Sequence, residues 1–266
     1  MIGKLFKYDF KALMRYLLPL YGALIISSVL TAVSVRNSHN GTVDELYSFN
    51  NNIITNIDII KSSLIMVYTI LAIAATVLTT VLIIVRFYKN LIGNEGYMMF
   101  ALPVKTSTHL IEKLLSGFFW SFIGLIVLFL SILIIIIFGT DISFSEFIKG
   151  IGIGWQFLVD SSYVGDFFLL LGICLLGIIG GIIKIYAVLS IGHQWSAHKI
   201  LGCFIAYIGI SIMENIVSQT FLVTIILSGE YSFDAIYLPL YIIVSAKIIV
   251  YGVISWFLLD RRLNLE

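Results

Sequence analysis

The chain has few of the residues that mark disulfide-rich, metal-binding or nucleic-acid-binding proteins. Two cysteines occur among its 266 residues, Cys174 and Cys203. Both lie in apolar runs far apart in sequence, so neither a disulfide framework nor a metal cluster is indicated. Charged residues make up 12% of the chain, against roughly 25% in soluble domains. The net charge is +1, which gives no reason to expect a nucleic-acid partner.

Signature motifs of enzymes are missing as well. No Gly-x-x-x-x-Gly-Lys-Ser/Thr sequence is present to hold nucleotide phosphates, and the nearest stretch, 177–184, has the wrong spacing inside an apolar run. His193 and His198 are too far apart for a His-Glu-x-x-His zinc helix, and no Gly-x-Ser-x-Gly nucleophile turn occurs. We therefore predict no catalytic residue, no metal site and no cofactor bound by this chain.

Long apolar runs dominate what is present. Apolar residues make up 60% of the chain, against roughly 45–50% in soluble domains, and a helix needs about 20 of them in a row to cross a bilayer. The sequence predicts an all-α, polytopic membrane protein with one transmembrane domain over residues 1–266. Its six spans are expected at about 17–35, 63–85, 114–138, 167–191, 201–227 and 238–259.

Lysine and arginine predict the orientation of these spans. Most of the 16 basic residues fall on one side if the N-terminus, the 86–113 loop, the 184–199 link and the C-terminus all face the cytosol. Basic residues prefer the cytosolic side, and the opposite loops are acidic. We expect a multi-pass protein with both termini in the cytosol.

The N-terminal segment, residues 1–16, has the pattern of a helix lying in the membrane interface. Four basic residues recur at three- and four-residue intervals along one side, and five apolar residues lie on the other. The basic set is Lys4, Lys7, Lys11 and Arg15; the apolar set is Ile2, Phe6, Phe10, Leu13 and Leu17. Such a helix places its cations toward anionic headgroups. The alternative is a basic flank that only sets topology. The segment around Trp155 is likewise predicted to lie at the outer membrane surface.

A short turn between the second and third spans contains apolar residues that would be exposed to water in a cytosolic loop. Asn94 can cap a short helix there, and Pro103 disfavours helix at the residue before it. The predicted element is a stub of about two turns within the 86–113 loop. Its apolar residues need a surface to be buried against, so we expect a partner protein. The alternative is a hairpin whose aromatic residues dip into the headgroups.

This turn resembles the cytosolic coupling region of ABC type-2 permeases. The resemblance is carried by Tyr88-Lys89-Asn90-Leu91-Ile92-Gly93-Asn94-Glu95-Gly96-Tyr97 and Phe100-Ala101-Leu102-Pro103-Val104. The basic start over 3–11 and the ending over 261–266 are similar to bacterial members. Unlike many members, the chain has only a short link between its last two spans.

The resemblance implies a function and its partners. It implies a half-transporter in the bacterial plasma membrane that works as a dimer, with a second permease subunit, identical or related, and two copies of an ABC ATPase subunit. ATP and Mg would bind to the ATPase, and the cargo would be a peptide, an antimicrobial compound or an amphipathic, lipid-like molecule. The residues implied to dock on the ATPase are Glu95, Gly96, Tyr97, Met98, Phe100, Leu102 and Pro103.

The alternative function is a secondary transporter or channel that works without ATP. Such proteins carry intramembrane carboxylates, or helices broken by Gly and Pro at matching positions in two halves. This chain has one carboxylate near mid-span and three prolines in all. An intramembrane enzyme, and a membrane anchor or sensor, are the remaining classes.

Glu214 and Lys247 lie within the fifth and sixth predicted spans, where each charge needs a partner or water. Measured from the turn between these spans, their depths differ by roughly 6 Å at 1.5 Å per residue, so the side chains can meet. Ser211, Asn215 and Ser218 share the helical face of Glu214. This polar stripe is either a structural ion pair with its neighbours, or the lining of a cargo path or a permease–permease interface.

Gly177 and Gly181 have the spacing that lets two membrane helices approach closely. We predict close packing there, either within the subunit or across a dimer.

Overall fold

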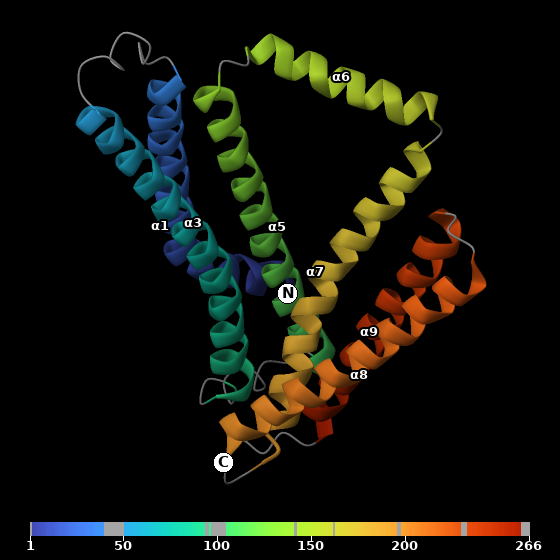
Figure 1. Cartoon of the computed structure of the whole chain (residues 1–266). Coiled ribbons are helices and arrows are strands. Elements are labelled where there is room, and N and C mark those ends of the chain that lie inside the picture. Colours follow the sequence, from blue (N-terminus) through green and yellow to red (C-terminus); the bar gives the residue numbers. More distant parts are fainter. Residues whose placement is uncertain are drawn as a thin grey trace. The chain divides into compact units, whose positions relative to one another are not determined.

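The computed structural model describes residues 2–39, 51–93, 96, 105–140, 143–161, 163–195, 198–229 and 233–261. Every regular element in these ranges is a helix, which confirms the all-α prediction (Figure 1). The helices are α1 (Ile2–His39), α3 (Asn51–Phe87), the π-helical turn η1 (Tyr88–Ile92), α5 (Thr106–Gly139), α6 (Phe144–Asp160), α7 (Val164–Gly192), α8 (Lys199–Ser228) and α9 (Phe233–Arg261).

Six of these helices are long and apolar enough to cross a membrane, and they contain the six predicted spans. By length and composition the candidate segments are Leu5–Arg36, Ile59–Ile92, Thr106–Gly139, Val164–Gly192, Lys199–Ser228 and Ile236–Asp260. Each extends beyond the predicted apolar run, because the backbone hydrogen bonds of a helix continue into its polar flanks. The chain therefore has the character of a multi-pass membrane protein.

The helices belong to two compact units. One unit comprises Met1–Asp9, Leu82–Phe119 and Ser161–Glu266, and the other comprises Phe10–Val81 and Trp120–Asp160. Three helices, α1, α3 and α5, run from one unit into the other.

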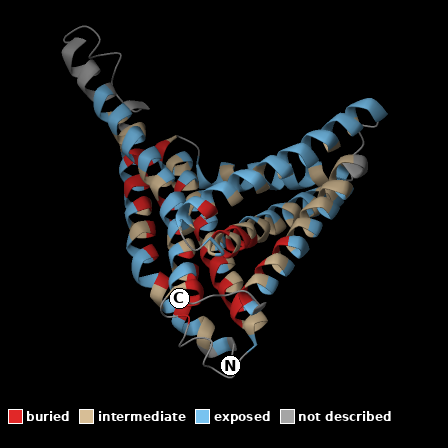
Figure 2. Cartoon of the chain, turned by 90° about the horizontal axis from the view of Figure 1, so that it is seen from below, coloured by how far each residue is buried: buried red, intermediate tan, exposed pale blue. Residues whose placement is uncertain are grey.

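The unit that contains Phe10–Val81 has polar contacts inside and apolar side chains outside. The Tyr21 hydroxyl lies 2.9 Å from Thr79 Oγ1, and the Tyr68 hydroxyl lies 2.8 Å from Ser131 Oγ. Large apolar side chains such as Phe129, which is 63% exposed, point away from the helix contacts. Hydroxyl pairs join membrane helices in this way because no water is present inside a bilayer to bind them. Exposed residues cover most of the helix surface (Figure 2).

The unit that contains the last three spans is built on α7, which packs against both α8 and α9. Near the end of α3, the Phe87 ring stacks on Tyr186 of α7 with centroids 3.9 Å apart. Leu91, Leu110 and Leu259 belong to the same buried cluster. This core fixes the end of α3 and the start of α5 against α7 and α9.

Two segments outside the predicted spans are helical. The N-terminal segment predicted as a separate interfacial helix is the beginning of α1, which continues through Pro19 to His39 without a break. The segment around Trp155 is α6, and none of its described side chains is buried. That each lies along a membrane surface stays a prediction.

The first turn of α6 is closed by a reciprocal pair of hydrogen bonds. The Ser143 backbone N–H donates to Glu146 Oε2 at 2.9 Å, and the Glu146 N–H donates to Ser143 Oγ at 3.2 Å. This is the capping-box arrangement of Ser-x-x-Glu. The hydrogen bond from the Ser143 backbone lowers the pKa of Glu146, because it stabilises the carboxylate form.

Candidate functional site

Five polar residues of α7, α8 and α9 meet inside the spans, and we name them the Glu214 cluster: Lys184, Ser211, Glu214, Lys247 and Tyr251. Lys184 Nζ donates to Glu214 Oε2 at 2.5 Å and to Ser211 Oγ at 3.1 Å. The Tyr251 hydroxyl donates to Glu214 Oε1 at 3.0 Å. Lys247 Nζ lies 3.8 Å from the same oxygen. One carboxylate therefore has two cationic neighbours and one hydroxyl donor.

The predicted contact between Glu214 and Lys247 is present, but it is the longer of the two ion pairs. The closer partner is Lys184, which was expected in a cytosolic link over 184–199 and lies within helix α7, since α7 continues to Gly192. Lys184 also lies 5.0 Å from the centre of the Tyr207 ring. Its position inside the apolar run 167–191 was the signal, since a charge at that depth requires a partner.

Asn215 and Ser218, the other two residues of the predicted polar stripe, bind different partners from Ser211. Asn215 Nδ2 donates to the Ser211 carbonyl at 2.9 Å, and Ser218 Oγ donates to the Glu214 carbonyl at 2.8 Å. Both side chains thus bind the backbone of α8 itself and are exposed. Hydroxyls and amides in membrane helices satisfy themselves in this way when no neighbouring helix faces them. Only Ser211 of the three joins the cluster.

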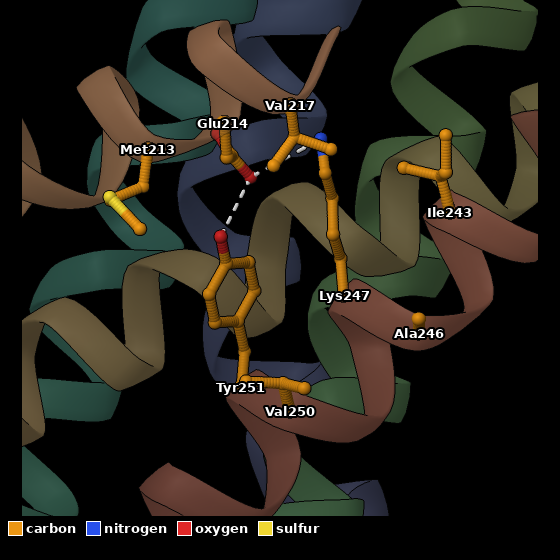
Figure 3. A pocket seen from close by; sticks show the side chains of 8 residues that line it. All are labelled: Met213, Glu214, Val217, Ile243, Ala246, Lys247, Val250 and Tyr251. Atoms are coloured by element: carbon orange, nitrogen blue, oxygen red, sulfur yellow. Dashed lines mark hydrogen bonds and ion pairs between the residues drawn. The ribbon is translucent and has the colours of Figure 1, made fainter. Parts of the chain in front are cut away.

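A cavity of about 250 Å³ lies beside the cluster, between α8 and α9. Figure 3 shows Lys247 and Tyr251 of α9 converging on the Glu214 carboxylate of α8. The lining is otherwise apolar. Its residues are Met213, Glu214, Val217, Ile243, Ala246, Lys247, Val250 and Tyr251.

A second cluster, the Asp9 cluster, consists of Asp9, Arg86, Asn90, Glu112 and Lys113. Arg86 donates to Asp9 Oδ1 through Nε at 2.9 Å, and Asn90 Nδ2 lies 3.4 Å from the same oxygen. Lys113 forms an ion pair with Asp9 Oδ2. Its Nζ also lies 3.6 Å from Glu112 Oε2, and Glu112 is fully buried. The cluster contains two carboxylates and two cations.

The Asp9 cluster joins the two helix ends that border the predicted coupling turn. Arg86 lies in the last turn of α3, Asn90 lies in η1, and Lys113 lies in α5. Within the coupling region predicted over 86–113, helix continues to Ile92 and begins again at Thr106; that this region is cytosolic stays a prediction. The pairing was missed because nothing in local periodicity links residues this far apart. The one signal was an acidic residue, Asp9, within a basic N-terminal segment.

The residues predicted to contact an ATPase are described only at Gly96. This residue is buried, and its N–H donates to the Gly93 carbonyl at 2.8 Å. The other six, Glu95, Tyr97, Met98, Phe100, Leu102 and Pro103, lie outside the described residues.

The described part of the structure shows no close contact at Gly177 or Gly181, so the packing predicted there stays a prediction. Among the described residues, nothing lies within 4 Å of a Cβ built on either glycine. The close approach occurs instead where α7 ends and α8 begins. A Cβ on Gly192 would collide with the backbone of Cys203, and one on Gly202 would lie 2.8 Å from the Gly192 carbonyl oxygen. A contact of Gly177 and Gly181 across a dimer stays a prediction.

In the part of the chain that the structure describes, no three histidine, cysteine, aspartate or glutamate side chains come together to hold a metal ion. No protein-family model matches this chain, and neither a curated protein nor a solved structure matches it. What can be said of function therefore depends on the two polar clusters, the cavity and the sequence between η1 and α5.

Proposed function

We propose that the chain is the permease subunit of an ATP-driven exporter of the ABC type-2 kind. The six spans and the resemblance of residues 88–104 to a coupling region support this proposal. The subunit pairs with a second permease, identical or related, and with two copies of a separate ATPase subunit that binds ATP and Mg. The cargo is a peptide, an antimicrobial compound or an amphipathic, lipid-like molecule that leaves through the bacterial plasma membrane, and both termini face the cytosol.

The observation that carries the proposal is the anchoring of both borders of the coupling turn. Asp9 binds Arg86 and Asn90 on one side of the turn and Lys113 on the other. At the start of α5, Thr106 Oγ1 donates to Asp260 of α9 at 2.7 Å. A turn held at both borders transmits a displacement into the spans instead of absorbing it as local motion. This is the mechanical requirement for coupling ATP hydrolysis to a change in the membrane helices.

Replacing both Tyr97 and Phe100 by Ala tests the proposal. The full chain is co-expressed with the ABC ATPase encoded beside its gene, purified in detergent, and assayed for retention of the ATPase and for cargo-stimulated ATP hydrolysis. Loss of one central aromatic anchor costs about 2 kcal/mol, so we expect the double change to lower the affinity for the ATPase by at least roughly thirtyfold. The membrane domain should keep its helix content.

The matched control replaces Phe144 and Phe157 of α6, which are 65% and 64% exposed, by Ala. This control removes two exposed aromatic side chains elsewhere and should leave the ATPase bound. If the Tyr97 and Phe100 variant retains the ATPase as well as this control does, or if no ATPase is encoded nearby or binds, the proposal is wrong.

The Glu214 cluster favours one second candidate, an ATP-independent transporter or channel. A carboxylate with two lysines inside the spans is the kind of feature that such proteins use to bind ions. Proteoliposomes that contain the full chain alone distinguish the two functions. Ion-gradient-driven uptake that is lost in Glu214→Gln would support this alternative, whereas the exporter should move nothing without its ATPase and ATP.

A further inference from the structure

The ion pairs of the Glu214 cluster are unequal. Lys184 approaches Glu214 to 2.5 Å and also contacts Ser211 and the Tyr207 ring. Lys247 lies 3.8 Å from Glu214, which is beyond hydrogen-bonding distance. The carboxylate charge is thus balanced mainly by Lys184, and one positive charge is left over at Lys247.

This excess charge faces the cavity between α8 and α9. Lys247 lines the cavity, and Lys184 does not. Both carboxylate oxygens of Glu214 already have closer partners, namely Lys184 at one and Tyr251 at the other. The Lys247 ammonium group keeps donors for a further acceptor. In a membrane span, that acceptor has to come from water, from lipid or from a ligand.

The remaining residues that line the cavity indicate that a ligand also has an apolar part. Figure 3 shows Val217 beside the Lys247 ammonium group, and Met213, Ile243 and Val250 belong to the apolar part of the lining. Its volume of about 250 Å³ lies below the roughly 300–1,000 Å³ of drug-sized pockets. It therefore fits a headgroup and part of one chain, and not a folded peptide.

We propose that this cavity is a binding site for the anionic group of an amphipathic molecule and part of one of its chains, with Lys247 as the residue that contacts its carboxylate or phosphate. Lys184 neutralises Glu214 and thereby frees Lys247 for this role. Tyr251 holds the Glu214 carboxylate through the hydrogen bond that its hydroxyl donates to Oε1. The further statement that the bound molecule is cargo rests on the proposed export function, whereas the anion site itself does not.

Photolabelling of the full chain tests the site directly. The protein is placed in phosphatidylcholine nanodiscs and exposed to a diazirine-bearing medium-chain fatty acid, or to the matching uncharged alcohol. Labelled peptides are located and quantified by mass spectrometry. A charge-assisted contact favours the carboxylate, so we expect it to label peptides of α8 and α9 saturably and about tenfold more strongly than the alcohol.

Three substitutions separate an anion site from a structural ion pair. Lys247→Met should lower carboxylate labelling about tenfold and leave alcohol labelling unchanged, and Lys247→Arg should retain it. Glu214→Gln should raise carboxylate labelling several-fold, because it removes the competing anion. The control Lys149→Met removes an exposed lysine of α6 and should change nothing.

The inference is overturned if carboxylate and alcohol label the cavity equally, if Lys247→Met labels like the unsubstituted chain, or if Glu214→Gln lowers labelling. Competition then identifies the source of the anion. Displacement by phosphatidylglycerol in the nanodisc assigns the site to a lipid headgroup, and displacement by an alkyl phosphate alone assigns it to a free amphipathic molecule. Displacement by neither also counts against the site.

Because labelling needs no ATPase, its outcome is independent of the proposed function. A chain that binds the ATPase but shows no carboxylate preference leaves the exporter proposal intact and removes the anion site. A chain that shows the preference but binds no ATPase keeps the anion site and removes its role in export.

Discussion

Replacing Asp9 by Asn removes the one carboxylate that holds both Arg86 and Lys113. Asp9 is 3% exposed, the Lys113 side chain is 2% exposed and the Arg86 side chain is 31% exposed. Breaking a buried ion pair by removing one partner typically costs about 3–5 kcal/mol, because the other charge is left buried. Arg86 can turn toward solvent, and Glu112 still neighbours Lys113, so we expect about 3 kcal/mol.

Reversible unfolding in mixed detergent micelles, followed by circular dichroism, measures this loss. A change of about 3 kcal/mol shifts the unfolding equilibrium on the order of a hundredfold. Asp160→Asn, at the exposed end of α6, is the matched control and should cost well under 1 kcal/mol.

The order of the effects tests the reasoning more sharply than their size. Lys113→Met leaves Glu112 without its cation in a fully buried position, whereas Arg86→Gln removes a partly exposed partner. We expect Lys113→Met to be the more destabilising of the two. An equal or reversed order, or a cost for Asp9→Asn no larger than that of Asp160→Asn, would refute the account of this cluster.

Three other changes have defined outcomes. Glu214→Gln should lower the free energy of unfolding by roughly 3 kcal/mol, because it leaves two lysines without their carboxylate. Adding Lys247→Met should restore little of this loss in the same unfolding assay, since full recovery needs Lys184→Met as well. Gly192→Ala should cost at least about 1–3 kcal/mol as an overpacked contact, measured by the same unfolding. The pKa of Glu146 is lowered in the folded chain, so the helix cap stabilises the fold at pH values above the ordinary glutamate pKa of 4.5. This stabilisation is lost as the pH falls below that value. Hydrogen-exchange protection in the first turn of α6 should therefore fall on acidification.

Each of these has a control within the chain. Recovery of stability in the double Glu214 and Lys247 variant would mean that Lys184 is not a true partner. Gly181→Ala should cost nothing, since a Cβ there meets no described atom and alanine favours helix over glycine. Glu146→Gln keeps an acceptor for the Ser143 N–H but does not titrate, so its protection should not fall on acidification. A pH response equal to that of the unsubstituted chain would contradict the cap.

The spans could be predicted because a bilayer imposes a length requirement that any apolar run either meets or fails. Helix ends could not be predicted in the same way. η1 and the first turns of α5 lie outside the predicted apolar runs but are helical in the structure, where Asp9 contacts Asn90 of η1 and Lys113 of α5. Those contacts join residues 77 and 104 positions apart, and no local pattern reports such pairing.

Only part of the Glu214 cluster could be predicted from the sequence. Depth counting brings Glu214 and Lys247 together because they lie on one antiparallel hairpin, where distance from the turn fixes height. Lys184 belongs to a helix outside that hairpin, so the same counting does not place it. The spacing of Gly177 and Gly181 does not say which helix packs against them, and no described atom lies within 4 Å of a Cβ at either position.

The Asp9 cluster has a consequence for the order in which the chain is made. Asp9 leaves the ribosome long before Arg86 and Lys113, which are 77 and 104 residues further along. During that interval its carboxylate has no partner from α3 or α5. The two cations are likewise free to act as orientation signals for the insertion machinery before they become ion-paired. The N-terminal segment can therefore reach its final position only after the start of α5 has been synthesised, so that a single aspartate links synthesis of the first turns of α5 to the final position of the first turns of α1.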